Sequence, residues 1–290
     1  MERIIIEYAD KIYPQKLRNL KKPPSRLYVK GNINILNKNG ISVIGSRTNT
    51  IYGENMCKKF VKDLVEYELT IISGLAIGID SIAHKTCLEH SGSTIAVLPC
   101  GLKNIYPKQN VDLLRKIIKE GGLIVTEYED NTKADSNKFL ERNRIIAGLG
   151  IGTLVIEGGY RSGTSVTAKY TKELNKPIFC IPSSLENKKG IITNKLIKSG
   201  ANLVTNVVDI LNYYKDIKFK KRKQIVPKEE KIKISEDLKK IYDCIRKETL
   251  DINQISRICK MSIQDVSYKL LLLQIEDFIE ELPGQRFKIK

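Results

Sequence analysis

Basic and small polar residues gather between positions 139 and 167, and their types are suited to binding phosphate. An Arg-Asn-Arg tripeptide at 142–144 stands near the start of a helix of small and apolar residues. An apolar strand at 152–156 is followed by a glycine-rich loop at 158–164, which opens another helix. Such a turn presents free backbone N–H groups and the positive end of a helix dipole. The pattern predicts a surface that binds a row of phosphates rather than one nucleotide.

Two further loops carry similar residues and also follow apolar strands. Gly45-Ser46-Arg47 comes after a strand at 41–44, and Ser73-Gly74 comes after a strand at 69–72. Arg47 stands at a helix entrance, where a guanidinium can donate two N–H groups to phosphate oxygens. A salt bridge at the sheet edge is the alternative for Arg47. Because ligands lie beyond the carboxyl ends of parallel strands, we expect all three loops along one edge of the sheet.

The candidate binding residues belong to these loops and to the helix that precedes the last of them. Phe139 and Tyr160 could stack on the bases of a single strand, although a place in the core is the alternative for each. Lys138 either lines the groove or is simply solvated. The full candidate set is Gly45, Ser46, Arg47, Ser73, Gly74, Lys138, Phe139, Arg142, Asn143, Arg144, Arg161, Ser162, Gly163 and Thr164.

Helical geometry separates the two arginines of the tripeptide. Residues two apart on an α-helix point about 200° apart, so Arg142 and Arg144 cannot both face one ligand. We expect one of them to bind outward and the other to be structural.

Several kinds of enzyme chemistry lack their motifs. The loop after the strand at 41–44 is not GxGxxG, and the chain contains neither GxxxxGK[ST] nor HExxH. The six cysteines are scattered without a CxxC pair, which suggests neither a zinc site nor a disulfide framework. His84, one turn after Asp80, is interpreted as a local hydrogen-bond partner. We therefore expect no catalytic residue, no metal and no cofactor.

Strands that alternate with helices of about ten residues predict βαβ units and a mostly parallel sheet. We expect an α/β protein with an extended Rossmann-like, doubly wound sheet, and with Asp80 capping a helix over 81–89. Expected strands are 26–29, 41–44, 69–72, 94–98, 123–125, 153–156, 177–181 and 201–204, and the expected helices between them include 51–67, 110–120, 165–174, 190–199 and 207–214.

The domain organisation predicted from these patterns has four parts. Residues 1–36 form a short N-terminal extension, and residues 37–214 form the Rossmann-like domain. Residues 215–233 form a basic linker, interpreted as a solvated tether that can add phosphate contacts. Residues 234–290 show three amphipathic helices and a hairpin, which is typical of a small winged-helix domain.

The net charge of +17 lies on the large domain and the linker. Residues 1–214 carry +11, residues 215–233 carry +6, and residues 234–290 are balanced. A basic body favours a polyanionic partner, while a lysine-rich bias that only aids solubility is the alternative. No apolar run approaches the ~20 residues that span a membrane, and the start of the chain does not read as a signal peptide. We expect a cytoplasmic location and no membrane contact.

The ordered motifs resemble the bacterial DNA-processing protein A family, DprA, also called Smf. The resemblance extends from about Pro24 to Leu211 and returns in 271–287, which resembles that family's winged helix. The motifs that carry it are Ser42–Arg47, Ile72–His84, Thr94–Leu102, Tyr106-Pro107, Thr126–Tyr128, Phe139–Gly148 and Arg161–Thr164.

The resemblance implies a non-enzymatic protein that binds and protects single-stranded DNA without sequence preference. It also implies loading of the RecA recombinase, displacement of single-strand-binding protein, a role in natural transformation and recombination, and a homodimer formed through the Rossmann domain. The family's DNA-contacting arginine falls on Arg47, and its pocket arginines and aromatic residue fall on Arg142, Arg144 and Phe139.

This chain departs from the family pattern at three places. Ile77 replaces the arginine of the usual SGLARGID loop, Leu140 replaces a proline, and Ser46 stands where threonine is common. The helical domain that many members carry at the N-terminus is expected to be reduced or absent.

The alternative function is that of a nucleotide-processing enzyme. The loop at 158–164 superficially resembles the PGGxGTxxE loop of LOG-type phosphoribohydrolases. Thr167 stands where that chemistry needs a glutamate, and more residues separate Gly159 from Gly163 than in that loop. In the winged helix, the candidate recognition helix at 262–274 holds one cation, Lys269, which predicts a role in protein contact rather than DNA reading.

Overall fold

The computed structural model describes residues 2–159, 162–222, 235–246, 248–276 and 278–289. The chain divides into two compact units, residues 1–224 and residues 225–290. In the described part of the chain, no helix is both long enough and apolar enough to cross a membrane.

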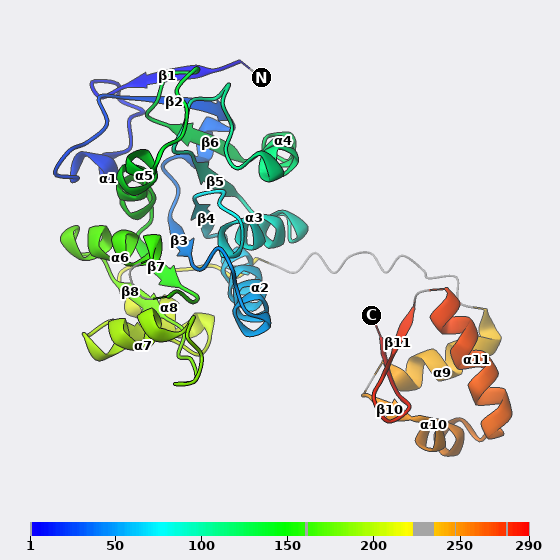
Figure 1. The fold of residues 1–290 in the computed structure, drawn as a ribbon. Coiled ribbons are helices and arrows are strands. Elements are labelled where there is room, and N and C mark those ends of the chain that lie inside the picture. Colours follow the sequence, from blue (N-terminus) through cyan, green and yellow to red (C-terminus); the bar gives the residue numbers. More distant parts are fainter. Residues whose placement is uncertain (1, 160–161, 223–234, 247, 277, 290) are drawn as a thin grey trace. The chain divides into compact units, whose positions relative to one another are not determined.

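The first unit is built on one nine-stranded sheet (Figure 1). Its strand order is β1-β2-β6-β5-β4-β3-β7-β8-β9. In this spatial order, every neighbouring pair from β6 to the edge strand β9 is parallel. The pairs β1–β2 and β2–β6 are antiparallel. The strands are β1 (Ile4–Glu7), β2 (Arg26–Gly31), β3 (Gly40–Ile44), β4 (Thr70–Ser73), β5 (Thr94–Val97), β6 (Leu123–Thr126), β7 (Gly152–Val155), β8 (Ile178–Cys180) and β9 (Asn202–Leu203).

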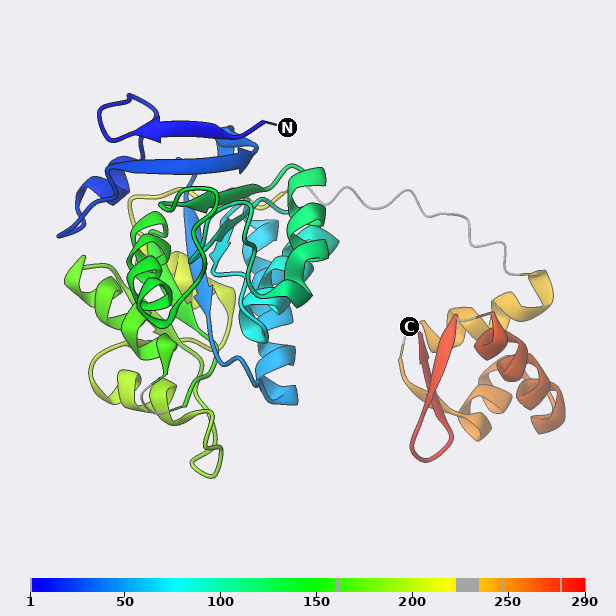
Figure 2. The ribbon, with the colours of Figure 1, turned by 45° about the horizontal axis from the view of Figure 1, so that its top comes forward.

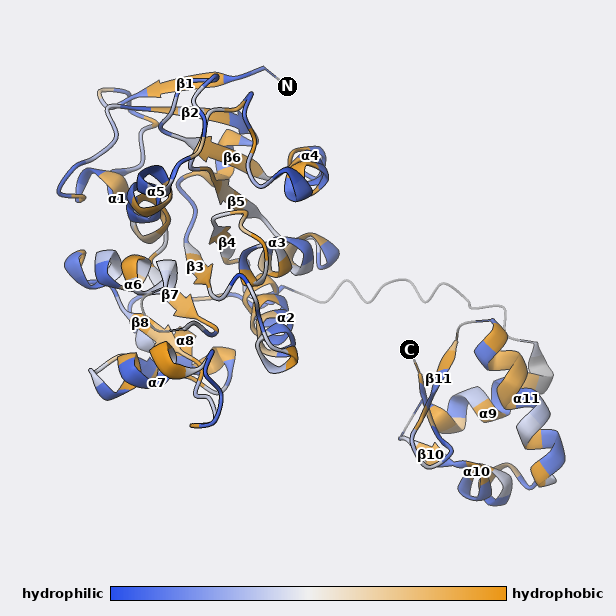
Figure 3. Cartoon of the chain, viewed as in Figure 1, coloured by the Kyte–Doolittle hydropathy of each residue, from blue (hydrophilic) through white to orange (hydrophobic). Residues whose placement is uncertain are grey.

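Helices cover both faces of this sheet, as Figures 1 and 2 show from two directions. Successive residues of a strand face opposite sides, so Ile41 and Val43 pack with α2, α3 and α8, whereas Ile44 packs with α5 and α6. Apolar strands lie between helices whose outer surfaces are largely hydrophilic (Figure 3). The helices of this unit are α1 (Gln15–Arg18), α2 (Ile51–Glu66), α3 (Ile79–Glu89), α4 (Val111–Lys119), α5 (Ser136–Leu149), α6 (Gly163–Glu173), α7 (Ile191–Lys198) and α8 (Val207–Tyr213), with short 3-10 turns η1 (Ile33–Ile35) and η2 (Lys108–Asn110).

The strand order reverses between β3 and β7, and this reversal creates a crevice. The chain steps outward from β3 to β6 and then returns to place β7 on the other side of β3. The loop after β3 leads to α2 on one face, and the loop after β7 leads to α6 on the other. Ligands of doubly wound sheets lie at such a switch point, beyond the carboxyl ends of the strands. The predicted doubly wound, mostly parallel sheet is confirmed.

Two segments expected to lie outside the Rossmann-like domain pack against it. Residues 4–7 and 26–31 add two antiparallel strands to the sheet edge beyond β6, so these parts of the expected N-terminal extension belong to the sheet. The sequence predicts residues 215–222 to be part of a solvated tether. Instead, Phe219 packs on the apolar core between the sheet and α2, α3 and α8, and Arg222 N–H donates to the carbonyl of Glu66.

The helix expected to start at Ser81 begins at Ile79 instead, and Asp80 does not cap it. The residue at the N-cap is Gly78, which has φ +85°. The Asp80 carboxylate accepts a hydrogen bond from Gly74 N–H at 3.1 Å. The interpretation of Asp80 as an N-cap was therefore wrong, because its carboxylate is used by the preceding loop.

The second unit has three helices and a three-stranded sheet of order β10-β12-β11. Leu238, Ile255 and Leu270 lie in its separate apolar core. This arrangement is that of a winged helix, as predicted. Its elements are α9 (Glu236–Ile245), β10 (Leu250–Asp251), α10 (Ile252–Cys259), α11 (Ile263–Ile275), β11 (Ile279–Leu282) and β12 (Arg286–Ile289).

Replacing Gly78 with alanine is expected to destabilise the fold more than replacing Gly121. Both glycines have positive φ, +85° and +81°, so in both variants alanine carries the backbone strain of a positive φ, about 1 kcal/mol. A Cβ at Gly78 would lie 2.3 Å from the Ser46 carbonyl oxygen, whereas a Cβ at Gly121 would meet nothing within 4 Å. We expect Gly78→Ala to lower the free energy of unfolding in urea by roughly 1–3 kcal/mol more than Gly121→Ala. Equal losses would contradict this packing argument.

Candidate nucleic-acid interface

A cavity of about 670 Å³ lies at the switch point, and we call it the strand-end pocket. The loops after β3, β4 and β7 all contribute to it, so the predicted meeting of these loops at one sheet edge is confirmed. The loop after β8 and helix α5 complete the wall. The lining residues are Ile44, Gly45, Ser46, Arg47, Thr48, Ala76, Asp80, Tyr106, Ser136, Phe139, Leu140, Arg142, Asn143, Ile146, Gly159, Ser162, Gly163, Thr164, Thr167 and Lys189.

Arg47 is the exposed cation of this lining. Its guanidinium carbon lies 4.8 Å from the centroid of the Phe139 ring, and that ring meets Tyr106 edge to face at 5.4 Å. Arg47 forms no ion pair with a described residue. A guanidinium held on an aromatic face keeps its N–H edge available for an anion. The sheet-edge salt bridge considered for Arg47 is thus absent from the described residues.

The amino end of α6 faces the same pocket. Gly163 and Thr164 are the first helical residues, and their N–H groups have no acceptor among the described residues. Ser162 holds the N-cap position without making a side-chain cap, and its buried hydroxyl has no described partner. Unsatisfied N–H groups together with the helix dipole favour an anion. This geometry suits a phosphate of the ligand.

Arg142 lines the pocket but is held from behind by backbone carbonyls. It is 3% exposed, and its Nη1 donates to Gly74 O at 2.7 Å and also to Val97 O. Both backbone polar groups of Gly74 are bound, because its N–H donates to Asp80 Oδ2 while its carbonyl accepts from Arg142. Burial lowers the pKa of Arg142 to about 10, opposed by the Asp80 carboxylate. Burial likewise raises the pKa of Asp80, opposed by Arg142. Arg142 therefore fixes the loop after β4 and adds positive potential to the pocket floor.

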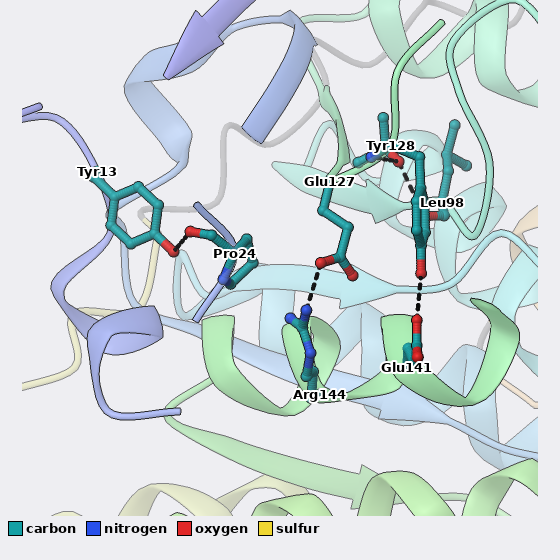
Figure 4. Close-up of polar contacts among 8 residues, drawn as sticks. Tyr13, Pro24, Leu98, Glu127, Tyr128, Glu141 and Arg144 are labelled. Carbon is teal, nitrogen blue, oxygen red and sulfur yellow. Dashed lines mark hydrogen bonds and ion pairs between the residues drawn. The ribbon is translucent and has the colours of Figure 1, made fainter. Parts of the chain in front are cut away.

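Arg144 points away from the strand-end pocket. Figure 4 shows its guanidinium against the Glu127 carboxylate, an ion pair in which both side chains are about 85% buried (15% and 14% exposed). Burial raises the pKa of Glu127, and the charge of Arg144 opposes that shift. The same view shows Tyr128 donating to Glu141 on α5 at 3.2 Å. The two arginines do part as helical geometry predicts, but each one is held by internal acceptors.

Other candidate residues lie next to the pocket or outside the described chain. The Ser73 hydroxyl donates to Val43 O at 2.7 Å inside the sheet, so it faces no ligand. Lys138 pairs with Asp135, the N-cap of α5. Asn143 lines the pocket and donates to Gly163 O at 3.3 Å, which ties α5 to the start of α6. Arg161 and its neighbour Tyr160 lie outside the described residues.

Lys189, Thr48 and Tyr106 line the pocket but were missed in the sequence. Lys189 comes from the loop after β8 and donates to the Thr48 hydroxyl. The rule that placed three loops at one edge applies equally to the loop after β8, so Lys189 could have been found. Tyr106 lies in a long loop after β5, and only tertiary packing against Phe139 brings it to the pocket.

His84 is buried beneath the loop after β4. Thr94 Oγ1 donates to Ile71 O, so His84 Nδ1–H donates to Thr94 Oγ1 at 2.7 Å. His84 Nε2 is buried and has no described partner. Burial, with a smaller contribution from the charge of Arg142, lowers the pKa of His84 to about 3. The interpretation of His84 as a local hydrogen-bond partner agrees with this geometry.

The pocket offers cations, N–H groups and an aromatic face, a set that suits the phosphates and bases of a nucleic acid strand. Thr167 lies one turn into α6, where its hydroxyl contacts Gly163 O at 3.3 Å. No group of three or more His, Cys, Asp or Glu among the described residues is arranged to hold a metal ion.

Comparison with known proteins agrees with this geometry. Residues 4–215 match the family model described as DNA recombination-mediator protein A. The chain belongs to this family. Residues 227–285 match the winged helix domain of the same family, DprA. The resemblance identified from the sequence motifs is confirmed.

Relatives of this family cover most of the chain. Protein Smf of Synechocystis sp. is 33% identical over 312 residues, which span 96% of this chain and 78% of the relative. The crystal structure of DprA from Streptococcus pneumoniae has a TM-score of 0.70 and 35% identity over 76% of each chain. DNA processing protein A of Helicobacter pylori, whose structure is described in terms of its single-stranded DNA binding mode, has a TM-score of 0.66 and 29% identity, covering 73% of this chain and 95% of its own.

Removing the charge of Arg144 is expected to destabilise the protein strongly. Arg144→Met leaves the Glu127 carboxylate buried without its partner, which costs about 3–5 kcal/mol in such pairs. Adding Glu127→Gln should recover most of this loss. Urea unfolding of the single and double variants measures both values, and a single variant as stable as the double would contradict the role of this pair.

The buried neutral His84 is expected to make stability depend on pH. Its pKa is about 3 when folded and near 6.5 when unfolded, so in that window only the unfolded chain binds the proton. The free energy of unfolding therefore falls as pH drops below about 6.5, by up to ~1.4 kcal/mol per pH unit. His84→Gln lacks this contribution, so wild type should lose about 2 kcal/mol relative to the variant between about pH 6.5 and about pH 5. Parallel stability curves would contradict the assignment.

Proposed function

We propose that this protein binds single-stranded DNA without sequence preference and acts as a recombination mediator rather than as an enzyme. The observation that carries the proposal is the exposed Arg47 guanidinium on the Phe139 ring, beside the free N–H groups at the start of α6. Cations that neutralise phosphates and an aromatic platform for bases form the usual combination in single-strand binders. The structure of the Helicobacter pylori relative is described in terms of its single-stranded DNA binding mode, which supports single-stranded DNA as the ligand of this chain.

Phosphates would contact the pocket from two directions. Arg47 and Lys189 supply charge from the loops after β3 and β8, and Gly163 and Thr164 supply backbone N–H groups from α6. Arg142 lies below them with three of its five N–H donors bound, two to the carbonyls of Gly74 and Val97 and one to the amide oxygen of Asn143. We therefore assign most of the side-chain contribution to DNA affinity to Arg47, and a positioning role to Arg142. We assign no direct DNA contact to Lys138 or Arg144, because they pair with Asp135 and Glu127. We also assign none to Arg161, which lies outside the described residues.

The further steps of the proposed function follow from the family. A recombination mediator would protect incoming DNA, displace single-strand-binding protein and load RecA onto the strand in natural transformation and recombination. The family's description as a recombination mediator supports this sequence of steps. We also propose a homodimer formed through the Rossmann-like domain and a cytoplasmic location, for which the six free cysteines are suited.

The alternative, a LOG-type phosphoribohydrolase, has weaker support. Its chemistry needs a glutamate one turn into the helix that follows the glycine-rich loop, and α6 carries Thr167 there. The acid that lines the pocket is Asp80, whose carboxylate is committed to Gly74 N–H. We therefore propose a binding surface rather than a catalytic site.

For the winged helix we propose a protein-contact role. Its helix α11 exposes Tyr268, Leu271 and Ile275 at 63%, 52% and 71%. Their spacing of three and four residues places them on one side of the helix. In α11, the candidate recognition helix, a largely apolar exposed surface favours a protein partner over the phosphates of duplex DNA.

Arg47→Ala is expected to weaken binding to fluorescent oligo-dT by about tenfold or more at low salt. It removes one phosphate contact, so the salt dependence of binding should become shallower by roughly 0.7 in the log–log slope. Fluorescence anisotropy across a salt series measures both quantities.

Arg115→Ala is the matched control for this experiment. Arg115 is an exposed arginine on α4 outside the pocket lining, paired with Asp112 of the same helix. It should bind like wild type. Wild type that fails to bind at low salt, or equal affinities for wild type and Arg47→Ala, would overturn the proposed function in this form.

A further inference from the structure

A second basic cleft lies at the opposite edge of the sheet from the strand-end pocket. It is a cavity of about 340 Å³ that we call the rear cleft. Asn39, Leu69 and Ser93 line it, and each directly precedes the first residue of β3, β4 or β5. The amino ends of parallel strands meet at the edge opposite to their carboxyl ends. The other lining residues are Lys38, Val65, Tyr67, Glu68, Gly92, Ile217, Lys218, Phe219, Lys220 and Arg222.

The segment after α8 forms one wall of the rear cleft because it is anchored to the first unit. Phe219 packs on the apolar core and lies 6.0 Å from Tyr214, ring centroid to centroid. Further along, Lys221 pairs with Glu66 at 3.0 Å, and Arg222 Nη1 donates to Ser91 O at 3.0 Å. These contacts hold the basic segment in place, although the sequence alone predicts a tether there.

The rear cleft concentrates positive charge. The ammonium groups of Lys38, Lys218 and Lys220 form no ion pair or hydrogen bond with a described residue. The acidic side chain of the lining is Glu68, which lies 3.9 Å from Arg222 Nε. Gathering like charges around one cavity is unfavourable unless an anion neutralises them. A single small anion would leave most of this charge uncompensated, whereas successive phosphates of a strand would match it.

We propose that the rear cleft binds the phosphate backbone of the same single-stranded DNA whose other part occupies the strand-end pocket. This inference rests on the proposed function and extends its footprint from one edge of the sheet to the other. Lysines act as point charges that contact phosphate without a fixed geometry, so the rear cleft adds affinity without reading sequence. An oligonucleotide too short to reach both edges would use the strand-end pocket alone.

The test compares two oligo-dT lengths, about 6 and about 30 nucleotides, on either side of the site size typical of a single fold. The triple variant Lys38→Ala, Lys218→Ala, Lys220→Ala should bind the long oligonucleotide about tenfold more weakly than wild type. Its log–log salt slope should be smaller by about 2, because three phosphate contacts are lost. Its affinity for the short oligonucleotide should not change.

A control triple variant removes the same charge elsewhere. Lys59, Lys85 and Lys119 are exposed lysines on α2, α3 and α4, outside both cavities. Their replacement by alanine should leave binding of the long oligonucleotide within about twofold of wild type. Equal losses in the two triple variants would mean that only net charge matters and would overturn the inference.

The outcomes also separate this inference from the proposed function. If wild type binds neither length, the proposed function itself is wrong. If Arg47→Ala weakens both lengths while the rear-cleft triple variant binds the long one like wild type, only the rear-cleft assignment is wrong. If the triple variant loses affinity for a polyglutamate peptide but keeps it for the long oligonucleotide, the rear cleft binds acidic peptides, and the DNA path is overturned.

Discussion

The backbone of Gly74 is the constraint on which the strand-end pocket depends. Asp80 accepts its N–H, and Arg142 donates to its carbonyl. A side chain at this position would overlap both groups, since a Cβ would lie 2.7 Å from Arg142 Nη2 and 2.8 Å from Asp80 Oδ2. Gly74 therefore joins the loop after β4, the start of α3 and the middle of α5. Because Arg142 also reaches Val97 O, this one group fixes the ends of two strands relative to α5.

Commitment of Arg142 to this framework divides the labour between the basic residues. The Arg142 guanidinium has three of its five N–H donors bound within the fold and so has fewer left for a ligand, although its charge still raises the potential of the pocket. Arg47 has the opposite environment, because it is exposed and its flat face lies on Phe139. The charge of Arg144 is neutralised by the Glu127 carboxylate, outside the strand-end pocket. The three arginines thus differ in burial, partners and expected role.

The two edges of the sheet share a preference for anions but use different chemistry. At the carboxyl edge, the helix amino end, an arginine and aromatic rings can bind both phosphate and base. At the amino edge, lysines from two segments line a smaller cavity without a helix amino end. A strand that follows both edges would be oriented by the first and retained by the second. The excess of basic charge on residues 1–222 supplies both sites without requiring charge on the winged helix, which is balanced.

The sequence by itself determined the fold class, because the apolar strands and the helices between them are local patterns, and parallel strands require their loops to meet at one edge. The same rule places Arg47, Ser162 and Thr164 near one another from the sequence alone. The sequence could not determine which arginine is free, since a partner such as Val97 O or Glu127 is brought in by distant parts of the chain. Nor could it show that Asp80 holds a loop rather than capping a helix, or that residues 215–222 pack on the core. Burial and the choice among hydrogen-bond partners arise only when all elements are packed together, and for that reason only the tertiary structure decided which cations face a ligand.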